Sequence, residues 1–257
     1  MNSEIQKVDR APVKLLQTFY QAVADDLEML MLLQDREPDW GILEGMRDCN
    51  FPKEMGLKLV SEEGTTAIEL MVQAVNSIPE TPESAYLDEL AADYADIYLN
   101  HSLQASPQES VWIDEESLTC QESMFQVRAW YELHGLAAEN WRVRSDDHLV
   151  LQLQFLSHLF ANAESENELT TAARFMDEHL LRWLGEFSLR VANRCGTAYF
   201  AGVVLLTAAY CEELRELMAK VLDQPRPSPE EIEERMQPKA SQVEVPLAYM
   251  PGMGPAV

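Results

Sequence analysis

Lysine and arginine are scarce in this chain of 257 residues, which has 19 of them against 44 Asp and Glu and a formal net charge of −25. None lies between Lys58 and Arg128, a stretch that holds fourteen acids. Such a surface repels nucleic acid and anionic lipid and attracts basic segments. We therefore expect no nucleic-acid partner and no stable membrane association. The alternative is that the acids form only a solvated face that keeps the protein soluble.

Motifs for catalysis and metal binding are also lacking. The four cysteines have no C-x-x-C spacing, which argues against a zinc site or a disulfide framework. No phosphate-binding glycine loop, G-x-S-x-G or H-E-x-x-H occurs, and the five histidines include no i, i+4 pair. We expect no cofactor, no metal and no enzymatic activity, since an enzyme acting on a small molecule would need a site that these motifs do not supply.

Signals for export and membrane insertion are missing as well. The first ten residues, MNSEIQKVDR, contain no apolar run of the kind found in signal peptides. The most apolar stretch, 197–211, is shorter than the ~20 residues that cross a bilayer. These features predict a cytoplasmic protein with a buried helix at 197–211.

Apolar residues recur at intervals of three and four, and this period predicts an all-α fold. Two stripes, one from Leu169 to Val191 and one from Phe200 to Val221, predict two helices that pack against each other. The other helices are expected at about 12–34, 40–48, 52–60, 65–77, 83–100 and 119–134, with a non-helical run at 101–114.

The sequence divides into a helical region and a proline-rich end. We expect a helical bundle over 1–222 whose two halves, 11–134 and 146–222, are joined by a hinge at 135–145. Seven of the thirteen prolines lie from Pro225 onward, so 223–257 is expected to be a flexible tail with one short helix near 229–237. Halves joined by a hinge can exchange between chains, which would give a domain-swapped homodimer.

Three segments resemble the TorD/DmsD (NarJ-like) family of redox-enzyme maturation chaperones. LDELAADYADIYL at 87–99 is similar to a family helix with an aromatic followed by a Leu-Phe pair, although Asn100-His101 replace the usual Gly-Pro. ASPQESVWID at 105–114 is similar to a Pro-rich segment ending in Ser-Val-Trp-x-Asp. RSDDHLVLQLQFLSHL at 144–159 resembles the Glu-Pro-x-Asp-His-Leu signature, with Arg-Ser in place of Glu-Pro.

The third segment also has the features of a helix start. Ser145 is a good N-cap, and Asp146 and Asp147 would lie in a first turn where the helix dipole favours negative charge. The helix beyond carries two apolar stripes and should be buried on two sides. Its start should therefore meet the hinge, with Asp147 and His148 in a partly enclosed acidic cleft.

The resemblance implies a cytoplasmic chaperone that binds the twin-arginine signal peptide and the apo form of a molybdopterin-containing oxidoreductase before export. Residues carried over as candidates for peptide binding are Tyr94, Ile97, Tyr98, Pro107, Gln108, Ser110, Trp112, Asp114, Asp147 and His148. Ordinary core packing is the alternative for Tyr94, Ile97 and Trp112, and a hydrogen-bonded core histidine is the alternative for His148. The competing function is an acidic helical adaptor, unrelated to export, that binds another basic segment and recruits a partner through its tail.

Overall fold

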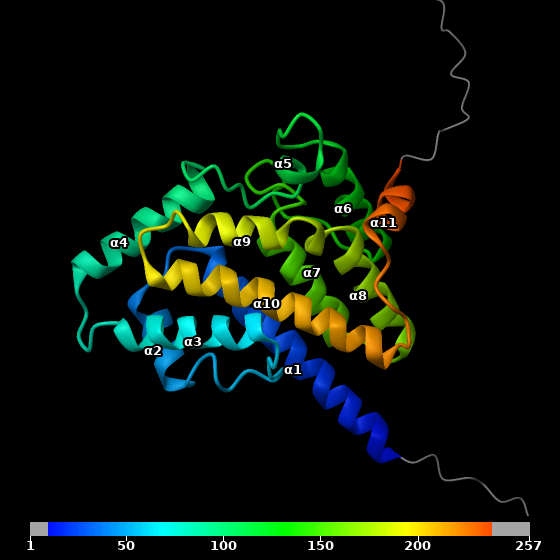
Figure 1. Cartoon of the computed structure of the whole chain (residues 1–257), viewed down its shortest axis with the longest axis horizontal. Coiled ribbons are helices and arrows are strands. Elements are labelled where there is room, and N and C mark those ends of the chain that lie inside the picture. The colour runs from blue at the N-terminus through cyan, green and yellow to red at the C-terminus, as the bar shows by residue number, and fades with distance from the viewer. Residues whose placement is uncertain (1–9, 238–257) are drawn as a thin grey trace, which may run out of the picture. The chain divides into compact units, whose positions relative to one another are not determined.

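The computed structural model describes residues 10–237, and these are helical almost throughout (Figure 1). Across these residues the only β-type pairing is an isolated antiparallel bridge between Gln108 and His148. The all-α prediction is confirmed. The elements are α1 (Arg10–Asp35), α2 (Trp40–Asp48), α3 (Glu62–Ser77), α4 (Ser84–Tyr94), a π-helical turn (Ala95–Leu99), α5 (Ser110–Ile113), α6 (Glu122–Leu133), α7 (Leu149–Ala161), α8 (Glu166–Glu178), a 3-10 turn (Leu180–Arg182), α9 (Leu184–Ala192), α10 (Ala198–Val221) and α11 (Pro229–Met236).

The chain forms two units, one up to Arg226 and one from Pro227 onward. In the second unit, α11 begins with a capping box in which Ser228 and Glu231 bond each other's backbone N–H groups. The short helix predicted near 229–237 is therefore confirmed. Residues 238–257, which make up most of the predicted flexible tail, lie outside the described residues.

Helix α10 is the central element of the first unit, with α9 on one side and α3 on the other (Figure 1). Its side chains Phe200, Val203 and Leu214 are fully buried. The predicted packing between the last two apolar stripes is confirmed, because α8 and α9 both contact α10. No helix within residues 10–237 combines the length and the apolar run that a membrane crossing requires.

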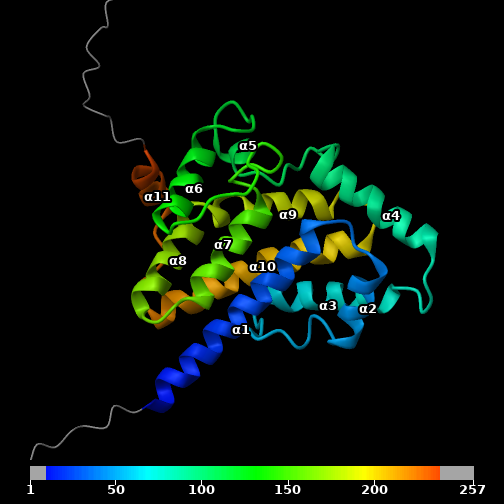
Figure 2. The ribbon, with the colours of Figure 1, turned by 180° about the vertical axis from the view of Figure 1, so that it is seen from behind.

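A second pair of helices joins the start of the unit to the segment that follows the 135–145 connector. Helix α1 lies along α7, as the reverse view shows (Figure 2). Leu27 and Leu30 from α1 and Leu153 and Leu156 from α7 are completely buried. Helices from before and after the 135–145 connector therefore share one core, and the hinge function of that connector stays a prediction.

The prediction of a helix at 52–60 is wrong, because this segment is extended and irregular. Met55, Leu57 and Leu59 are buried while the residues between them are exposed, which is the period of an extended chain. The carboxylate of Asp26 accepts the backbone N–H of Leu57 at 3.0 Å. This side chain supplies the hydrogen bond that a helical turn would otherwise have made.

The stripe from Leu169 to Val191 predicted a continuous helix, and this prediction is wrong. The backbone leaves the α-helix at His179 (φ −128°, ψ −81°), passes through the 3-10 turn and resumes as α9. The apolar side chains stay buried across the break. The His179 ring turns inward to a buried carboxylate, described below, and that contact takes the place of a regular helical turn.

Close helix packing at Gly202 gives a first prediction. A Cβ at this position of α10 would lie 2.9 Å from Sδ and 3.3 Å from Cα of Met71 on α3. We expect Gly202→Ala to lower the free energy of unfolding by about 1–3 kcal/mol, because the two helices must separate. Urea denaturation measures this. The control is Gly45→Ala on α2, where a Cβ meets nothing within 4 Å and Ala should stabilise the helix; equal effects at both sites would contradict the packing argument.

Candidate functional site

The second and third family-like segments meet at the start of α7. The backbone N–H of Leu149 donates to the carbonyl oxygen of Pro107 at 2.8 Å, and that of Glu109 donates to the carbonyl oxygen of Asp147 at 3.2 Å. Together with the bridge between Gln108 and His148, these bonds hold 107–109 antiparallel to 147–149. The structure thus brings together five of the candidate residues, Pro107, Gln108, Ser110, Asp147 and His148.

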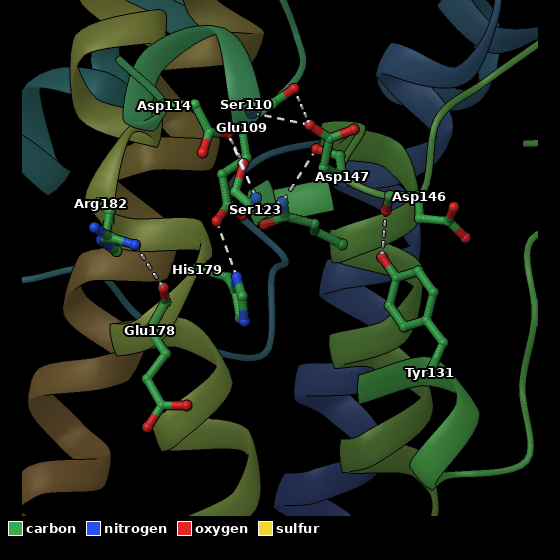
Figure 3. Close-up of polar contacts among 11 residues, drawn as sticks. Glu109, Ser110, Asp114, Ser123, Tyr131, Asp146, Asp147, Glu178, His179 and Arg182 are labelled. Atoms are coloured by element: carbon green, nitrogen blue, oxygen red, sulfur yellow. Dashed lines mark hydrogen bonds and ion pairs between the residues drawn. The ribbon is translucent and has the colours of Figure 1, made fainter. Parts of the chain in front are cut away.

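Asp147 is fully buried at this junction and faces Ser110, as Figure 3 shows. Its Oδ2 accepts the backbone N–H of Ser110 at 2.9 Å and the Ser110 hydroxyl at 2.6 Å. Charge-assisted bonds of this kind offset the cost of removing a carboxylate from water. Asp147 therefore fixes α5 against the start of α7.

The cap of α7 differs from the expected one. The helix begins at Leu149, and the N-cap is His148, whose Nδ1 accepts the backbone N–H of Val150 at 3.2 Å. The prediction that Ser145 caps this helix, with Asp146 and Asp147 in its first turn, is wrong. Both carboxylates precede the helix because they are held by partners on α5 and α6.

His148 is a buried neutral base. Desolvation, with Arg144 and His101 nearby, lowers the pKa of its imidazole to about 3. A neutral ring leaves Nδ1 free to accept the capping hydrogen bond. The alternative of a hydrogen-bonded core histidine describes its observed geometry.

Glu109 is a second buried carboxylate, and the sequence alone did not single it out. Its Oε1 lies 2.9 Å from Nδ1 of His179, and its Oε2 accepts the amide of Gln152 at 2.8 Å. All three side chains are fully buried. Gln152 is one of two glutamines in the largely apolar run LVLQLQF, and because Gln154 is exposed, the sequence did not show which of the two lies in the core.

Helix α6 is joined to the same junction by several polar contacts. Arg128 binds the carboxylate of Asp146 at 2.7 Å. The Tyr131 hydroxyl donates to the Asp146 carbonyl oxygen at 2.9 Å, as Figure 3 shows. Asp114, at the end of α5, accepts hydrogen bonds from the backbone and hydroxyl of Ser123 at the start of α6. We call the set Glu109, Ser110, Asp114, Ser123, Arg128, Tyr131, Asp146, Asp147, Gln152 and His179 the junction network.

The aromatic candidates on the first family-like segment lie in the core. The Tyr94 hydroxyl donates to the Asp35 carbonyl oxygen at 2.9 Å, and the Tyr98 hydroxyl donates to Gln34 at 3.0 Å. Burial raises the pKa of both phenols. Ile97 is fully buried. These side chains attach the π-helical turn and the end of α4 to α1.

Trp112 is half-buried and bridges α5 to α9. Its Nε1 donates to the Ser106 carbonyl oxygen at 2.8 Å, and the Arg190 guanidinium lies 4.3 Å from the ring centroid. The ring edge packs against Phe187. Gln108 and Asp114 are also partly exposed. Trp112, Gln108 and Asp114 are therefore the candidates of the 105–114 segment whose side chains solvent can reach.

A groove lies next to the junction network, between α1, α7 and the connector that follows α6. Its volume is about 740 Å³. The ion pair between Arg144 and Asp35 holds the connector to the end of α1. Apolar side chains Met31, Leu136, Val143, Leu151 and Phe155 and the exposed acids Glu28 and Glu139 line this connector groove.

Comparison with known proteins identifies the family. Residues 59–188, about half of the chain, match the model described as "Nitrate reductase delta subunit". The chain belongs to this family. The matched range contains every member of the junction network, and it places the chain among the NarJ/TorD redox-enzyme maturation chaperones.

Individual relatives agree with this assignment. The chain is 26% identical over 165 residues to the "Chaperone protein TorD" of Vibrio cholerae serotype O1 (Classical Ogawa strain), covering 61% of this chain and 74% of that protein. It is 29% identical over 154 residues to the TorD of the El Tor Inaba strain, covering 57% and 69%, and 26% identical over 153 residues to that of Vibrio vulnificus (strain YJ016), covering 56% and 70%. These relatives are chaperones, so the predictions of family and of a non-enzymatic chain are confirmed. Within residues 10–237 no cluster of His, Cys, Asp or Glu is suited to hold a metal ion.

The buried Asp147–Ser110 contact predicts a large stability effect. Replacing Asp147 with Ala removes two charge-assisted hydrogen bonds and leaves buried donors without a partner. We expect a loss of about 3 kcal/mol in unfolding free energy. Asp147→Asn should cost roughly half as much, because its amide oxygen still accepts from Ser110. In a double-mutant cycle with Ser110→Ala the coupling should exceed about 1 kcal/mol; a coupling near zero would show that the contact contributes nothing.

His148 predicts a pH dependence of stability. Its folded-state pKa is about 3, so below the ordinary pKa near 6.5 the unfolded chain binds a proton that the folded chain does not. Stability from this residue is therefore lost as pH falls from 6.5 toward 3, by ~1.4 kcal/mol per pH unit. His148→Asn keeps an acceptor for the cap but does not titrate. Urea unfolding of both proteins at about pH 7.5 and about pH 5.5 should show the smaller loss for the variant, whereas parallel losses would exclude His148 as a source.

Proposed function

We propose that this protein is a cytoplasmic chaperone that binds the twin-arginine signal peptide and the apo form of a molybdopterin-containing oxidoreductase and assists cofactor insertion before export. Membership of the redox-enzyme maturation chaperone family carries this proposal. The four free cysteines agree with a reducing compartment. The client is thus a protein precursor, and the cofactor belongs to the client.

The connector groove is the surface that best fits such a peptide. A twin-arginine signal peptide has adjacent arginines followed by an apolar run. In the groove, Met31, Leu151 and Phe155 offer apolar contacts, and the exposed carboxylates of Glu28 and Glu139 offer partners for guanidinium groups. This combination supports binding of both parts of the peptide in one place.

The junction network then acts on the peptide indirectly, by positioning the walls of the groove. Tyr131 belongs to the network and also lines the groove, where its ring lies 4.9 Å from that of Phe155. Arg144, two residues before Asp146, fixes the connector to α1. We therefore assign Asp147, Ser110 and His148 a positioning role, and Gln108, Trp112 and Asp114 are the family-like candidates left with exposed surface for direct contact.

The expected affinity follows from the apolar run. Burying ~500 Å² of apolar peptide surface at about 25 cal/mol per Å² gives ~12 kcal/mol before ordering and association costs. Micromolar binding corresponds to about −8 kcal/mol, which leaves roughly a third of the gross value for those costs. Attraction between arginines and exposed acids is screened by salt, so affinity should fall as ionic strength rises.

Fluorescence anisotropy with a labelled peptide carrying adjacent arginines and an apolar run tests the proposal. We expect micromolar affinity, a loss of about tenfold when both arginines become Gln, and weaker binding at ~500 mM than at ~50 mM NaCl. Glu28→Gln with Glu139→Gln should weaken binding. The matched control is Glu62→Gln with Glu63→Gln, which removes the same charge from two exposed acids that do not line the connector groove and should leave affinity unchanged.

Two results would contradict the proposal. Equal affinity for the Arg and Gln peptides would exclude recognition of the arginine pair, and equal losses from the two glutamate pairs would show general charge attraction. Affinity purification from the native host followed by mass spectrometry identifies the client. Recovery of an unrelated basic protein in place of a molybdoenzyme precursor would favour the adaptor function.

A further inference from the structure

A second groove runs along α10 between α3 and α9, far in sequence from the connector. Figure 1 shows α10 flanked by these two helices. The groove has a volume of about 790 Å³, and it is lined by residues of all three helices and by the corner at Val60 and Ser61. Neither the junction network nor the connector groove contributes to it.

The groove exposes apolar side chains that have no cover in the described part of the chain. Val60 is 81% exposed, Leu189 is 58% exposed and Leu70 is 39% exposed, on three separate elements around the groove. Between them Leu205 and Ala208 form a low floor on α10. Contiguous apolar surface of this kind is typical of an interaction site.

Carboxylates surround this apolar floor. Glu62 and Glu63 lie on the α3 side, and Glu212 and Glu216 lie on α10. No ion pair to Glu62 or Glu63 forms within residues 10–237, and both side chains are exposed. An apolar floor between acids is complementary to a segment with an apolar face and basic flanks.

The protein itself shows how these acids bind arginine. The guanidinium of Arg226 pairs with Glu212 and Glu216 and lies 3.7 Å from Asp177 on α8. Carboxylates at the rim of this groove can therefore bind a guanidinium group, and Arg226 already occupies the two on α10. Glu62 and Glu63, on the other side, offer the same chemistry without an internal partner.

The walls of the groove are held in place. The carboxylate of Glu213 on α10 accepts the backbone N–H groups of Val60 and Ser61 and the Ser61 hydroxyl. Ser61 in turn caps α3 by accepting the N–H of Gly64. A groove whose wall is fixed in this way is preorganised, which lowers the cost of binding.

We propose that this three-helix groove is a docking surface for a basic amphipathic helix of a protein partner, separate from the signal-peptide site. Its lining on α10 extends from Leu205 to Lys220, about 22 Å at 1.5 Å per residue, which matches four helical turns. A helix placed here puts its apolar face on Leu205, Leu189 and Leu70 and its flanking arginines or lysines beside Glu62 and Glu63. Helix-in-groove binding uses such anchors at i, i+3, i+4 and i+7.

Gly185 on α9 offers a steric test that leaves the fold intact. It lines the groove, and a Cβ at this position meets nothing within 4 Å. Gly185→Leu should therefore place a side chain in the groove without a clash. Gly45→Leu on α2 is the matched control, since it is also a helical glycine with open space around its Cβ.

The probe is a synthetic 16-residue peptide with leucines on one helical face and arginines beside them. A scrambled peptide with the same composition but no apolar face is its control. By fluorescence anisotropy we expect the amphipathic peptide to bind at least about tenfold more tightly than the scrambled one. Gly185→Leu should weaken it about tenfold or more, and Gly45→Leu should not.

The two glutamate pairs separate this proposal from the signal-peptide proposal. Glu62→Gln with Glu63→Gln should weaken the amphipathic peptide severalfold, and Glu28→Gln with Glu139→Gln should leave it unchanged. Circular dichroism checks that every variant is folded. Equal binding of the scrambled peptide, or equal effects of the two glycine variants, would overturn the proposal. A change in sedimentation caused by Gly185→Leu, with unchanged peptide binding, would show a self-association face and would also overturn it.

Discussion

Two carboxylates buried at the start of α7 constrain the arrangement of the helices around them. Asp147 and Glu109 are both removed from solvent, and each is stable only where its donors are present. The donors come from separate elements, namely Ser110 on α5, Gln152 on α7 and His179 after α8. Supplying donors to Oδ2 of Asp147 and to both oxygens of Glu109 therefore fixes three elements in one arrangement. The late start of α7 and the break between α8 and α9 both follow from this requirement.

The helices themselves could be predicted because an apolar stripe at the helical period records which face is buried. The residues at which the helices begin and end were predicted less accurately. Ser145 and His148 are both residues with a side-chain acceptor, and the fold decides between them by holding Asp146 and Asp147 elsewhere. The break at His179 left no trace in the stripe, since the apolar residues on both sides remain buried. Residues 52–60 are extended and not helical, because Asp26 accepts a backbone N–H group of this segment and because Met55, Leu57 and Leu59 are buried at every second position.

In the candidate functional site, too, some features could be predicted from the sequence and others could not. The resemblance named candidate residues in both 105–114 and 144–159 without predicting that the two segments touch, and the structure joins them directly through the backbone hydrogen bond from Leu149 to Pro107. The direction in which each side chain points was beyond the sequence. Asp147 is a residue type usually found at the surface, yet its side chain is buried in the core. The hydroxyls of Tyr94 and Tyr98 donate hydrogen bonds to residues of α1. Glu109 and Glu63 are both acids in the stretch without Lys or Arg, and the sequence does not distinguish them. Only the tertiary fold shows that the carboxylate of Glu109 is buried and that of Glu63 is exposed.

Whether a carboxylate is buried or exposed decides whether its charge stabilises the fold or contributes to the electrostatic field at the surface. Within the stretch without Lys or Arg, Asp93 on α4 fixes the residues just before α10 by accepting the N–H groups of Gly196 and Thr197, and Glu109 is paired inside the core. Such carboxylates hold the fold together and add little to the field that a partner meets. Glu62 and Glu63 remain at the surface beside an apolar groove, as Glu28 and Glu139 do beside the connector. Long-range attraction is common to all basic segments, so at the two proposed sites discrimination between partners would come from the shapes of the apolar floors. On the two proposals made above, a basic segment would be attracted by charge and retained where its apolar residues fit.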